Sequence, residues 1–343
     1  MEILHSELTA MSSSNIEDVL QSLKEVVISQ QVGTTHEPTP TELFALILAS
    51  LCSGHEQPHT LQLLEIFYAT IPSTAPVVVR SQYKQVLFGL LGLCKANTEN
   101  SKLIRLSLAS LGRCMKMQET SEAFWRSKEA MHGINAMLRM IDDPKVKLRK
   151  AVQQELIALM VVHKKSNATF VRNYIADFAV EVMKSCSKSD YKRALHVVIF
   201  LEQAAQYFVE KDAVKVCEFC LRLQECHQAV LSVEVFRMLD SFFQSPALSL
   251  SGAQTLECIR LLYSYQPATA DMETNTYFCG VVASSLVCLH KLDRNLSNSA
   301  FTHGVSLLLS KCEKDFTEIH VAVGNAIKRI VTSCVDSQIV LLH

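Results

Sequence analysis

Residues 133–162, GINAMLRMIDDPKVKLRKAVQQELIALMVV, contain two amphipathic segments separated by a turn. Apolar residues recur at three- and four-residue steps on both sides of Asp143-Pro144, at Ile134, Met137, Leu138 and Ile141, and then at Leu148, Val152, Leu156 and Leu159. This spacing places each set on one face of an α-helix. Proline cannot continue a helix, so the stretch predicts two helices that fold back on each other in an antiparallel pair.

The same pattern repeats along the whole chain. The sequence has only 10 Gly and 8 Pro in 343 residues, which disfavours a turn-rich β-fold. We expect helix pairs at 16–30 with 41–53, 77–95 with 99–115, 121–141 with 144–163, 168–186 with 190–207, 211–224 with 228–244, 252–266 with 274–291, and 297–311 with 315–335. Successive pairs begin about 40 residues apart, which is the period of HEAT and armadillo arrays. The predicted fold is an all-α solenoid over 1–343, a single domain with irregular helices in 1–72 and an extra helix in 54–72.

The quoted stretch also resembles the HEAT consensus, in which an acidic residue and an arginine form a ladder between adjacent repeats. Asp143 and Arg149 occupy the matching positions. The chain ends on the apolar residues VLLH, without a polar cap. Because terminal repeats of a solenoid need a polar outer face, we expect these repeats to be part of a longer array.

Composition indicates an intracellular protein. Hydrophobic residues make up 49% of the chain, and its twelve cysteines are scattered singly through apolar patterns. The first residues lack the charge and apolar run of a secretory signal, and no apolar run reaches the roughly 18 residues of a membrane span. We therefore expect reduced thiols and no membrane partner.

Charge is distributed unevenly although the net charge is only −1. Residues 1–70 carry nine acidic residues against Lys24, whereas residues 139–193 carry twelve basic residues against six acidic ones. Ten of these cations form the predicted basic stripe: Lys145, Lys147, Arg149, Lys150, Lys164, Lys165, Arg172, Lys188, Lys192 and Arg193. They are either a solvated face with the Asp143–Arg149 ladder, or a surface for nucleic-acid phosphates or an acidic protein. The absence of interleaved aromatic residues argues against base recognition.

No motif for catalysis or for a cofactor occurs in the sequence. Phosphate-binding glycine loops, HExxH and GxSxG are absent. Cys217 and Cys220 with Cys226 and His227 have zinc-like spacing, but on a continuous helix their ends lie over about 13 Å apart, so core cysteines are the favoured interpretation. The single Trp125 is expected to pack between repeats, with ligand stacking as the alternative. We predict no catalytic, metal or cofactor-binding residues.

Three stretches in order resemble the ribosomal RNA-processing protein 12-like family, over an N-terminal portion of its members. They are FWRSKEAMHGINAMLRMIDDPKVKLRKAVQQELIAL at 124–159, IRLLYSYQPATADM at 259–272 and AVGNAIKRIVTSCVD at 322–336. The resemblance implies a HEAT-repeat scaffold of the nucleus and nucleolus without enzymatic activity. It also implies contacts with pre-ribosomal particles, through RNA or protein, and with the Ran GTPase and nucleoporins.

Three function classes follow. The first is a scaffold in pre-rRNA processing and in the maturation and export of ribosomal subunits. The alternative is a karyopherin-like nuclear transport adaptor that binds Ran or nucleoporins, for which the acidic residues 1–70 offer a surface. An enzyme with an unrecognised site is the third, and it requires titratable groups that converge in a pocket.

Overall fold

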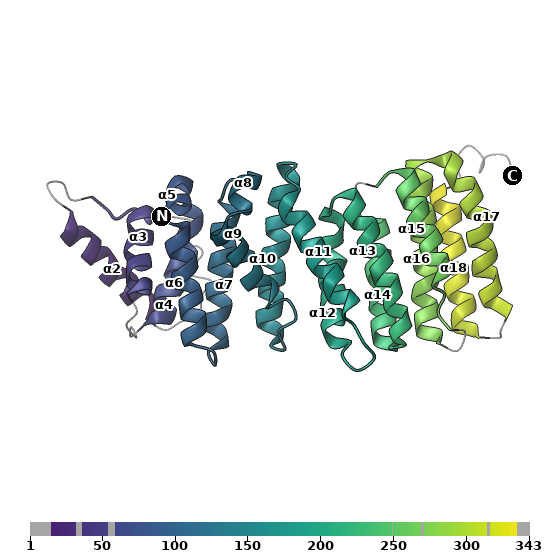
Figure 1. Ribbon diagram of the computed structural model, residues 1–343, viewed down its shortest axis with the longest axis horizontal. Helices are drawn as coiled ribbons and strands as arrows, with labels where there is room; N and C mark the ends of the chain where they lie inside the picture. Colours follow the sequence, from purple (N-terminus) through teal and green to yellow (C-terminus); the bar gives the residue numbers. More distant parts are fainter. Residues whose placement is uncertain are drawn as a thin grey trace. The chain divides into compact units, whose positions relative to one another are not determined.

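Seventeen α-helices and four short 3-10 helices make up the described part of the chain in the computed structural model, and no strand occurs in that part (Figure 1). The structure describes residues 15–31, 36–53, 59–248, 250–268, 271–313 and 316–334. The prediction of an all-α solenoid built from antiparallel helix pairs is confirmed. The chain divides into two compact units, residues 1–168 and 169–343, so one uninterrupted solenoid over 1–343 stays a prediction.

The first unit contains nine of the α-helices. They are α2 (Ile16–Gln30), α3 (Pro40–Cys52), α4 (Thr60–Thr70), α5 (Pro76–Ser81), α6 (Tyr83–Ala96), α7 (Ser101–Lys116), α8 (Glu122–Trp125), α9 (Lys128–Leu138) and α10 (Val146–Lys165), with η1 (Ile71–Ser73) after α4.

The second unit contains the other eight. They are α11 (Phe170–Lys184), α12 (Lys192–Ala204), α13 (Glu210–Arg222), α14 (Ala229–Gln244), α15 (Gly252–Ser264), α16 (Met272–Leu292), α17 (Arg294–Ser310) and α18 (Thr317–Cys334). The 3-10 helices η2 (Ala205–Tyr207), η3 (Leu223–Cys226) and η4 (Lys311–Glu313) follow α12, α13 and α17.

The start of the first unit differs from the prediction. The sequence paired 16–30 with 41–53 and left 54–72 as an extra helix, but α3 packs chiefly against α4, and α2 is the additional helix that contacts both. The physical reason is burial: α4 is covered by its neighbours from Leu63 to Phe67, and even Glu65 is only 3% exposed. Such a helix requires a close partner on each side.

Two predicted helices are each broken in two. The segment 77–95 divides into α5 and α6 at Gln82, and the segment 121–141 divides into α8 and α9 at Arg126 and Ser127. The Ser127 side chain accepts a hydrogen bond from the Ala130 amide at 3.3 Å, which starts a new helix inside an apolar pattern.

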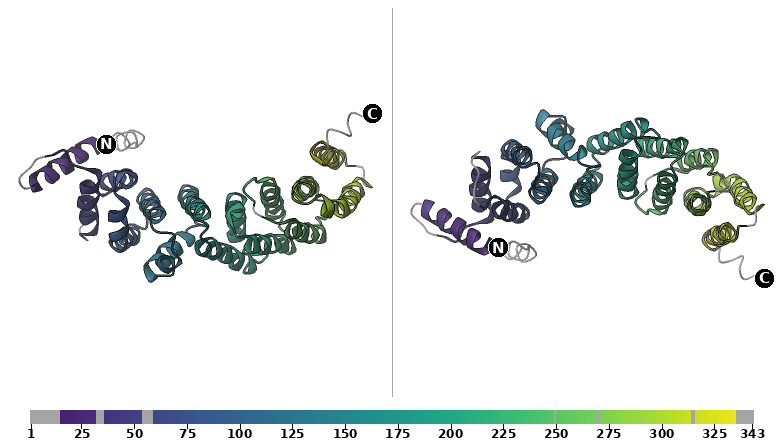
Figure 2. Two further views of the ribbon diagram at one scale, coloured as in Figure 1. Left: turned by 90° about the horizontal axis from the view of Figure 1, so that it is seen from above. Right: turned by 90° about the horizontal axis from the view of Figure 1, so that it is seen from below.

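The helices of each unit form two rows, seen nearly end-on in Figure 2. In the second unit, α11, α13, α15 and α17 form the first row, and α12, α14, α16 and α18 form the second. Helices of the second row pack more extensively against each other than those of the first row do. The second row therefore lies on the inner side of this unit's curve, and within it every residue from 281 to 287 of α16 is buried.

Polar contacts link neighbouring repeats within each unit. In the first unit, Lys102 of α7 pairs with Glu65 of α4 at 2.9 Å, and Lys116 of α7 pairs with Glu155 of α10 at 2.8 Å. In the second unit, Lys215 of α13 pairs with Asp177 of α11 at 2.7 Å. These ion pairs supply the inter-repeat ladder that the sequence assigned to Asp143 and Arg149.

Candidate functional site

The turn between α9 and α10 presents the first group of predicted basic residues. The Asp143 carboxylate accepts a hydrogen bond from the Lys145 amide at 2.8 Å, and the Arg149 guanidinium donates to the Asp143 carbonyl at 2.6 Å. Arg149 therefore stabilises its own turn and makes no ladder with Asp143 between repeats. Lys145, Lys147 and Lys150 are exposed and pair with no described carboxylate. We call these three lysines the α10-turn cluster.

Lys164 and Lys165 lie at the opposite end of the same helix. α10 runs from Val146 to Lys165, and at 1.5 Å per residue Lys164 is about 26 Å along the axis from Lys147. Positive side chains near a helix C-terminus interact favourably with its carbonyl ends. These two lysines therefore do not extend the α10-turn cluster.

Arg172 is a structural residue of the second unit. It is 5% exposed, and its guanidinium donates to the Tyr207 carbonyl at 3.1 Å, at the turn that joins α12 to α13. Burial lowers its pKa. This turn lies at the opposite end of the helices from the turn that carries Lys188, so Arg172 belongs to no surface that Lys188 forms.

Lys184, Lys188, Lys192 and Arg193 surround the turn from α11 to α12, and all four are exposed. We call them the α11-turn cluster. Nine of the ten predicted residues thus fall into the two turn clusters, the C-terminal end of α10 and the buried Arg172. The tenth, Arg149, bonds to the Asp143 carbonyl within its own turn. The α10-turn and α11-turn clusters lie in different units. Within each unit, the predicted residues do not form one continuous stripe. Binding by these residues stays a prediction.

Phe219 adds an aromatic ring beside the α11-turn cluster. The Lys184 ammonium lies 5.2 Å from the Phe219 ring centroid, and the Arg222 guanidinium lies 5.0 Å from it. Both cations also contact carboxylates, Lys184 with Glu181 and Arg222 with Glu218. This arrangement is not visible in the local sequence pattern, because Phe219 is separated from Lys184 by 35 residues. The repeat period brings it alongside, since α11 and α13 are neighbours in the first row.

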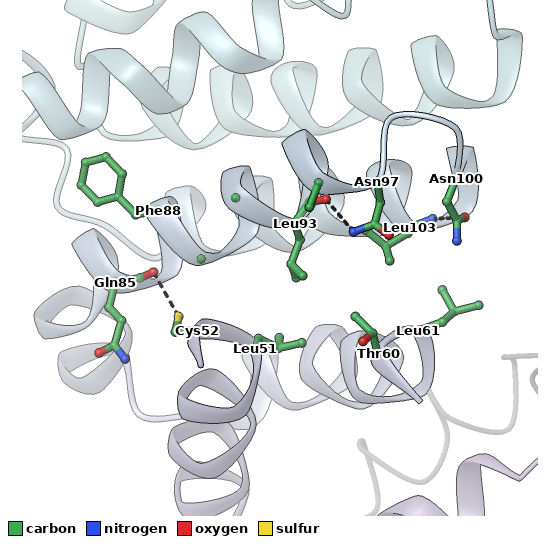
Figure 3. A pocket seen from close by; sticks show the side chains of 13 residues that line it. Leu51, Cys52, Thr60, Leu61, Gln85, Phe88, Leu93, Asn97, Asn100 and Leu103 are labelled. Atoms are coloured by element: carbon green, nitrogen blue, oxygen red, sulfur yellow. Dashed lines mark hydrogen bonds between the residues drawn. The ribbon is translucent and has the colours of Figure 1, made fainter. Parts of the chain in front are cut away.

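A cavity of about 720 Å³ lies in the first unit between α3, α4, α6 and α7 (Figure 3). Leu51, Leu61 and Leu93 point into it, and Phe88 at its rim is 53% exposed. Its polar groups bond within the fold: Cys52 to the Gln85 carbonyl at 3.7 Å, Asn97 to the Leu93 carbonyl at 3.0 Å, and the Leu103 amide to Asn100 at 3.1 Å. The lining can hold an apolar side chain, and the described residues that line it include no carboxylate, histidine or lysine.

Cys217 and Cys220 of the zinc-like motif are core residues, whereas Cys226 is half-buried. Cys217 and Cys220 are 2% and 0% exposed in α13, and Cys220 contacts the Met183 sulfur at 3.4 Å. Cys226 lies beyond the helix, where its sulfur is 3.5 Å from that of Cys186. Among the described residues, no three histidine, cysteine or carboxylate side chains converge as metal ligands would.

Trp125 is buried inside the first unit. Its ring contacts lie within the predicted helix pair 121–141 with 144–163, so packing between repeats stays a prediction. Trp125 is 1% exposed, its indole donates to the Glu119 carbonyl at 2.8 Å, and its ring meets Phe124 and His163 edge-to-face at 5.2 and 4.9 Å. His163 belongs to α10, so the indole joins α8 to the neighbouring helix. A buried ring with its donor satisfied is not placed to stack on a ligand.

Comparison with known proteins identifies the class. Residues 33–250 match the family described as RRP12-like, N-terminal HEAT repeats, and the chain belongs to this family of HEAT-repeat proteins. The resemblance found in the sequence is thereby confirmed.

Two crystal structures of engineered proteins are also similar to the chain. One has 13% identity and a TM-score of 0.39, covering 72% of this chain and 97% of the engineered one. The other has 12% identity and a TM-score of 0.40, covering 95% and 77% respectively. No curated protein matches the chain at a significant level.

Through the described ranges, no helix combines the length and the apolar character that crossing a bilayer requires.

Proposed function

We propose that this chain is a non-enzymatic scaffold of ribosome biogenesis, acting in the nucleus and nucleolus on pre-rRNA processing and on the maturation and export of ribosomal subunits. Its membership of the RRP12-like HEAT-repeat family carries the proposal. The cavity between α3, α4, α6 and α7 supports it, because its described lining is mostly apolar and brings no pair of titratable groups together.

The experiment that tests this function is fractionation of a nucleolar extract that contains the tagged chain. Co-sedimentation with pre-ribosomal particles, followed by crosslinking to their RNA or proteins, is the expected result. Absence of the chain from every pre-ribosomal fraction contradicts the proposal.

The α10-turn cluster is the surface that we propose for pre-ribosomal RNA or for an acidic ribosomal protein. Lys145, Lys147 and Lys150 are exposed at one turn, and cations without a carboxylate partner are suited to phosphate oxygens. Reversal of all three to Glu is expected to weaken RNA binding at least tenfold and to lower the slope of log affinity against log salt by about 2. A gel-shift titration at several salt concentrations measures both quantities.

A matched control reverses Lys84, Lys95 and Lys128, which are also exposed in the first unit. This variant has the same net charge but an intact α10-turn cluster, and it is expected to bind almost as the original chain does. If both variants lose the same affinity, the effect comes from net charge, and the α10-turn cluster is not the RNA-binding surface.

The transport-adaptor alternative is supported by the acidic balance of residues 1–70. A pulldown with GTP-loaded and GDP-loaded Ran distinguishes the two functions. Capture that requires GTP favours the transport adaptor, whereas capture of pre-ribosomal particles without Ran favours the scaffold.

A further inference from the structure

Two cysteines from neighbouring repeats meet on one edge of the second unit. Cys186 follows α11, and Cys226 ends η3, forty residues later. Their sulfur atoms are 3.5 Å apart, whereas a disulfide bond is about 2.05 Å long. A movement of roughly 1.5 Å would therefore join them.

The two turns that carry these thiols are already held together. The Gln228 side chain donates to the Lys188 carbonyl at 3.2 Å, which crosses from one turn to the other. His227, directly after Cys226, has φ 51°, and this left-handed residue ends the 3-10 turn. The main chain is thus positioned beside the neighbouring repeat before any bond forms.

The surroundings distinguish this pair from the core thiols. Cys217, Cys220 and Cys258 are almost fully buried, whereas Cys186 and Cys226 are half-buried. Both line a cavity of about 410 Å³, and its lining includes three cations, Lys184, Lys188 and Arg222, and one carboxylate, Glu225. Lys184 and Arg222 are paired with carboxylates of their own helices, whereas Lys188 pairs with no described carboxylate. A small anionic oxidant can enter this cavity, and one of its carboxylates would meet Lys188.

We propose that Cys186 and Cys226 are a reversible disulfide site that exchanges with a low-molecular-weight anionic disulfide of the glutathione type and so joins two adjacent repeats covalently. This site is independent of the scaffold function proposed above.

The exchange proceeds in two balanced steps. The thiolate of one of the two cysteines attacks one sulfur of the small disulfide, forms a mixed disulfide and releases one small thiolate. The thiolate of the other cysteine then attacks the protein sulfur of the mixed disulfide and releases the second small thiolate. The two protein thiols are oxidised, the small disulfide is reduced to two thiols, and the two protons from the cysteines end on those thiols.

Burial, followed by the hydrogen bond with Cys226, raises the pKa of Cys186. Only the thiolate form of a cysteine attacks a disulfide, so this burial slows the reaction of Cys186 at neutral pH.

The test exposes the purified full chain to mixtures of oxidised and reduced glutathione at neutral pH. Remaining thiols are then alkylated and the chain is digested with trypsin. The expected product links peptide 185–188 to peptide 223–237, in at least about tenfold excess over any other cysteine pair. Reduction is expected to reverse the linkage.

Three variants make the assignment specific. Cys186→Ser and Cys226→Ser are each expected to abolish the linked peptide, while Cys52→Ser, a half-buried thiol of the first unit, leaves it unchanged. Circular dichroism confirms that each variant is folded, and the result on the original chain is decisive without them. Glutathione attached to either cysteine without the linked peptide, a linkage only between two molecules, or unmodified thiols would overturn the proposal.

Discussion

Glycine has two different roles in the helices of the first unit. A Cβ atom added at Gly112 of α7 would lie 2.7 Å from the Glu155 Cβ of α10, so this glycine permits the close approach of α7 and α10. A Cβ added at Gly92 of α6 would meet nothing within 4 Å. The residue type is the same at both positions, and the packing around it differs.

Gly112→Ala is expected to destabilise the chain by about 1–3 kcal/mol, because two Cβ atoms cannot separate without a backbone shift. Gly92→Ala is expected to stabilise it by up to about 1 kcal/mol, since alanine is the better helix former. Urea unfolding of the two variants measures the difference. Equal effects of the same sign would contradict this account of Gly112.

Buried cysteine thiols are expected to make the free energy of unfolding depend on pH in the alkaline range. Burial raises the pKa of Cys94, Cys279 and Cys288 from 9.0 to about 11. A thiol whose pKa is higher in the folded than in the unfolded chain stabilises the fold. Its full contribution is present below about pH 9 and is lost as the pH rises toward 11. The free energy of unfolding is therefore expected to fall between these limits. In a Cys288→Ala variant the fall should be smaller, and an unchanged profile would contradict the assignment.

The ion pair between α4 and α7 tests how neighbouring helices are held together. Glu65 is 4% exposed and pairs with Lys102 at 2.9 Å, whereas the pair of Lys84 and Glu129 is longer, at 3.6 Å, and more exposed. Lys102→Met leaves a buried carboxylate without this partner and is expected to cost about 2 kcal/mol. Lys84→Met is the control and is expected to change stability by less than about 0.5 kcal/mol.

Urea unfolding of both variants gives these values. The double variant Glu65→Gln with Lys102→Met should recover part of the loss, because the unpaired charge is removed. If Lys102→Met is as harmless as Lys84→Met, the pair does not hold α4 to α7.

Helix positions were predictable to a large extent, because apolar periodicity and breaks are local properties. The expected helix 16–30 coincides with α2, and 228–244 coincides with α14 to within one residue. The breaks at Gln82 and Ser127 were missed, since the apolar pattern continues through both. The α3–α4 pairing was missed because it depends on burial around Glu65, which is not a local property.

The candidate site was predictable only where its residues are close in sequence. Lys145, Lys147 and Lys150 share one turn, as their spacing suggests. Contacts between repeats join residues that are far apart in sequence. Lys102 and Glu65 are 37 positions apart, and Cys186 and Cys226 are 40 positions apart. Charge and thiol pairs at one repeat period are the signal that would have found them. The stripe stays a prediction, and within the first unit the length of α10 separates Lys164 and Lys165 from the α10-turn cluster.

At the scale of the whole molecule, the division into two units predicts two unfolding transitions. Trp125, the single tryptophan, lies buried in the first unit, so its fluorescence reports that unit, while far-UV circular dichroism reports the helices of both. The midpoints of the two signals in urea are expected to differ. Gly112→Ala should move the fluorescence midpoint more than the circular dichroism midpoint. Coincident curves in both proteins would indicate one cooperative unit.

The unequal packing of the two rows in the second unit has a mechanical consequence. Second-row helices are tightly joined from α12 to α18, while first-row helices touch each other less. A pulling force along this unit therefore separates the first row before the second, and the unit flexes by changing the spacing on its outer side. A disulfide between Cys186 and Cys226, at the ends of two first-row helices, would join the repeats at this more compliant row. Oxidation would then make the second unit stiffer, because the bond would limit how far its first-row helices can separate.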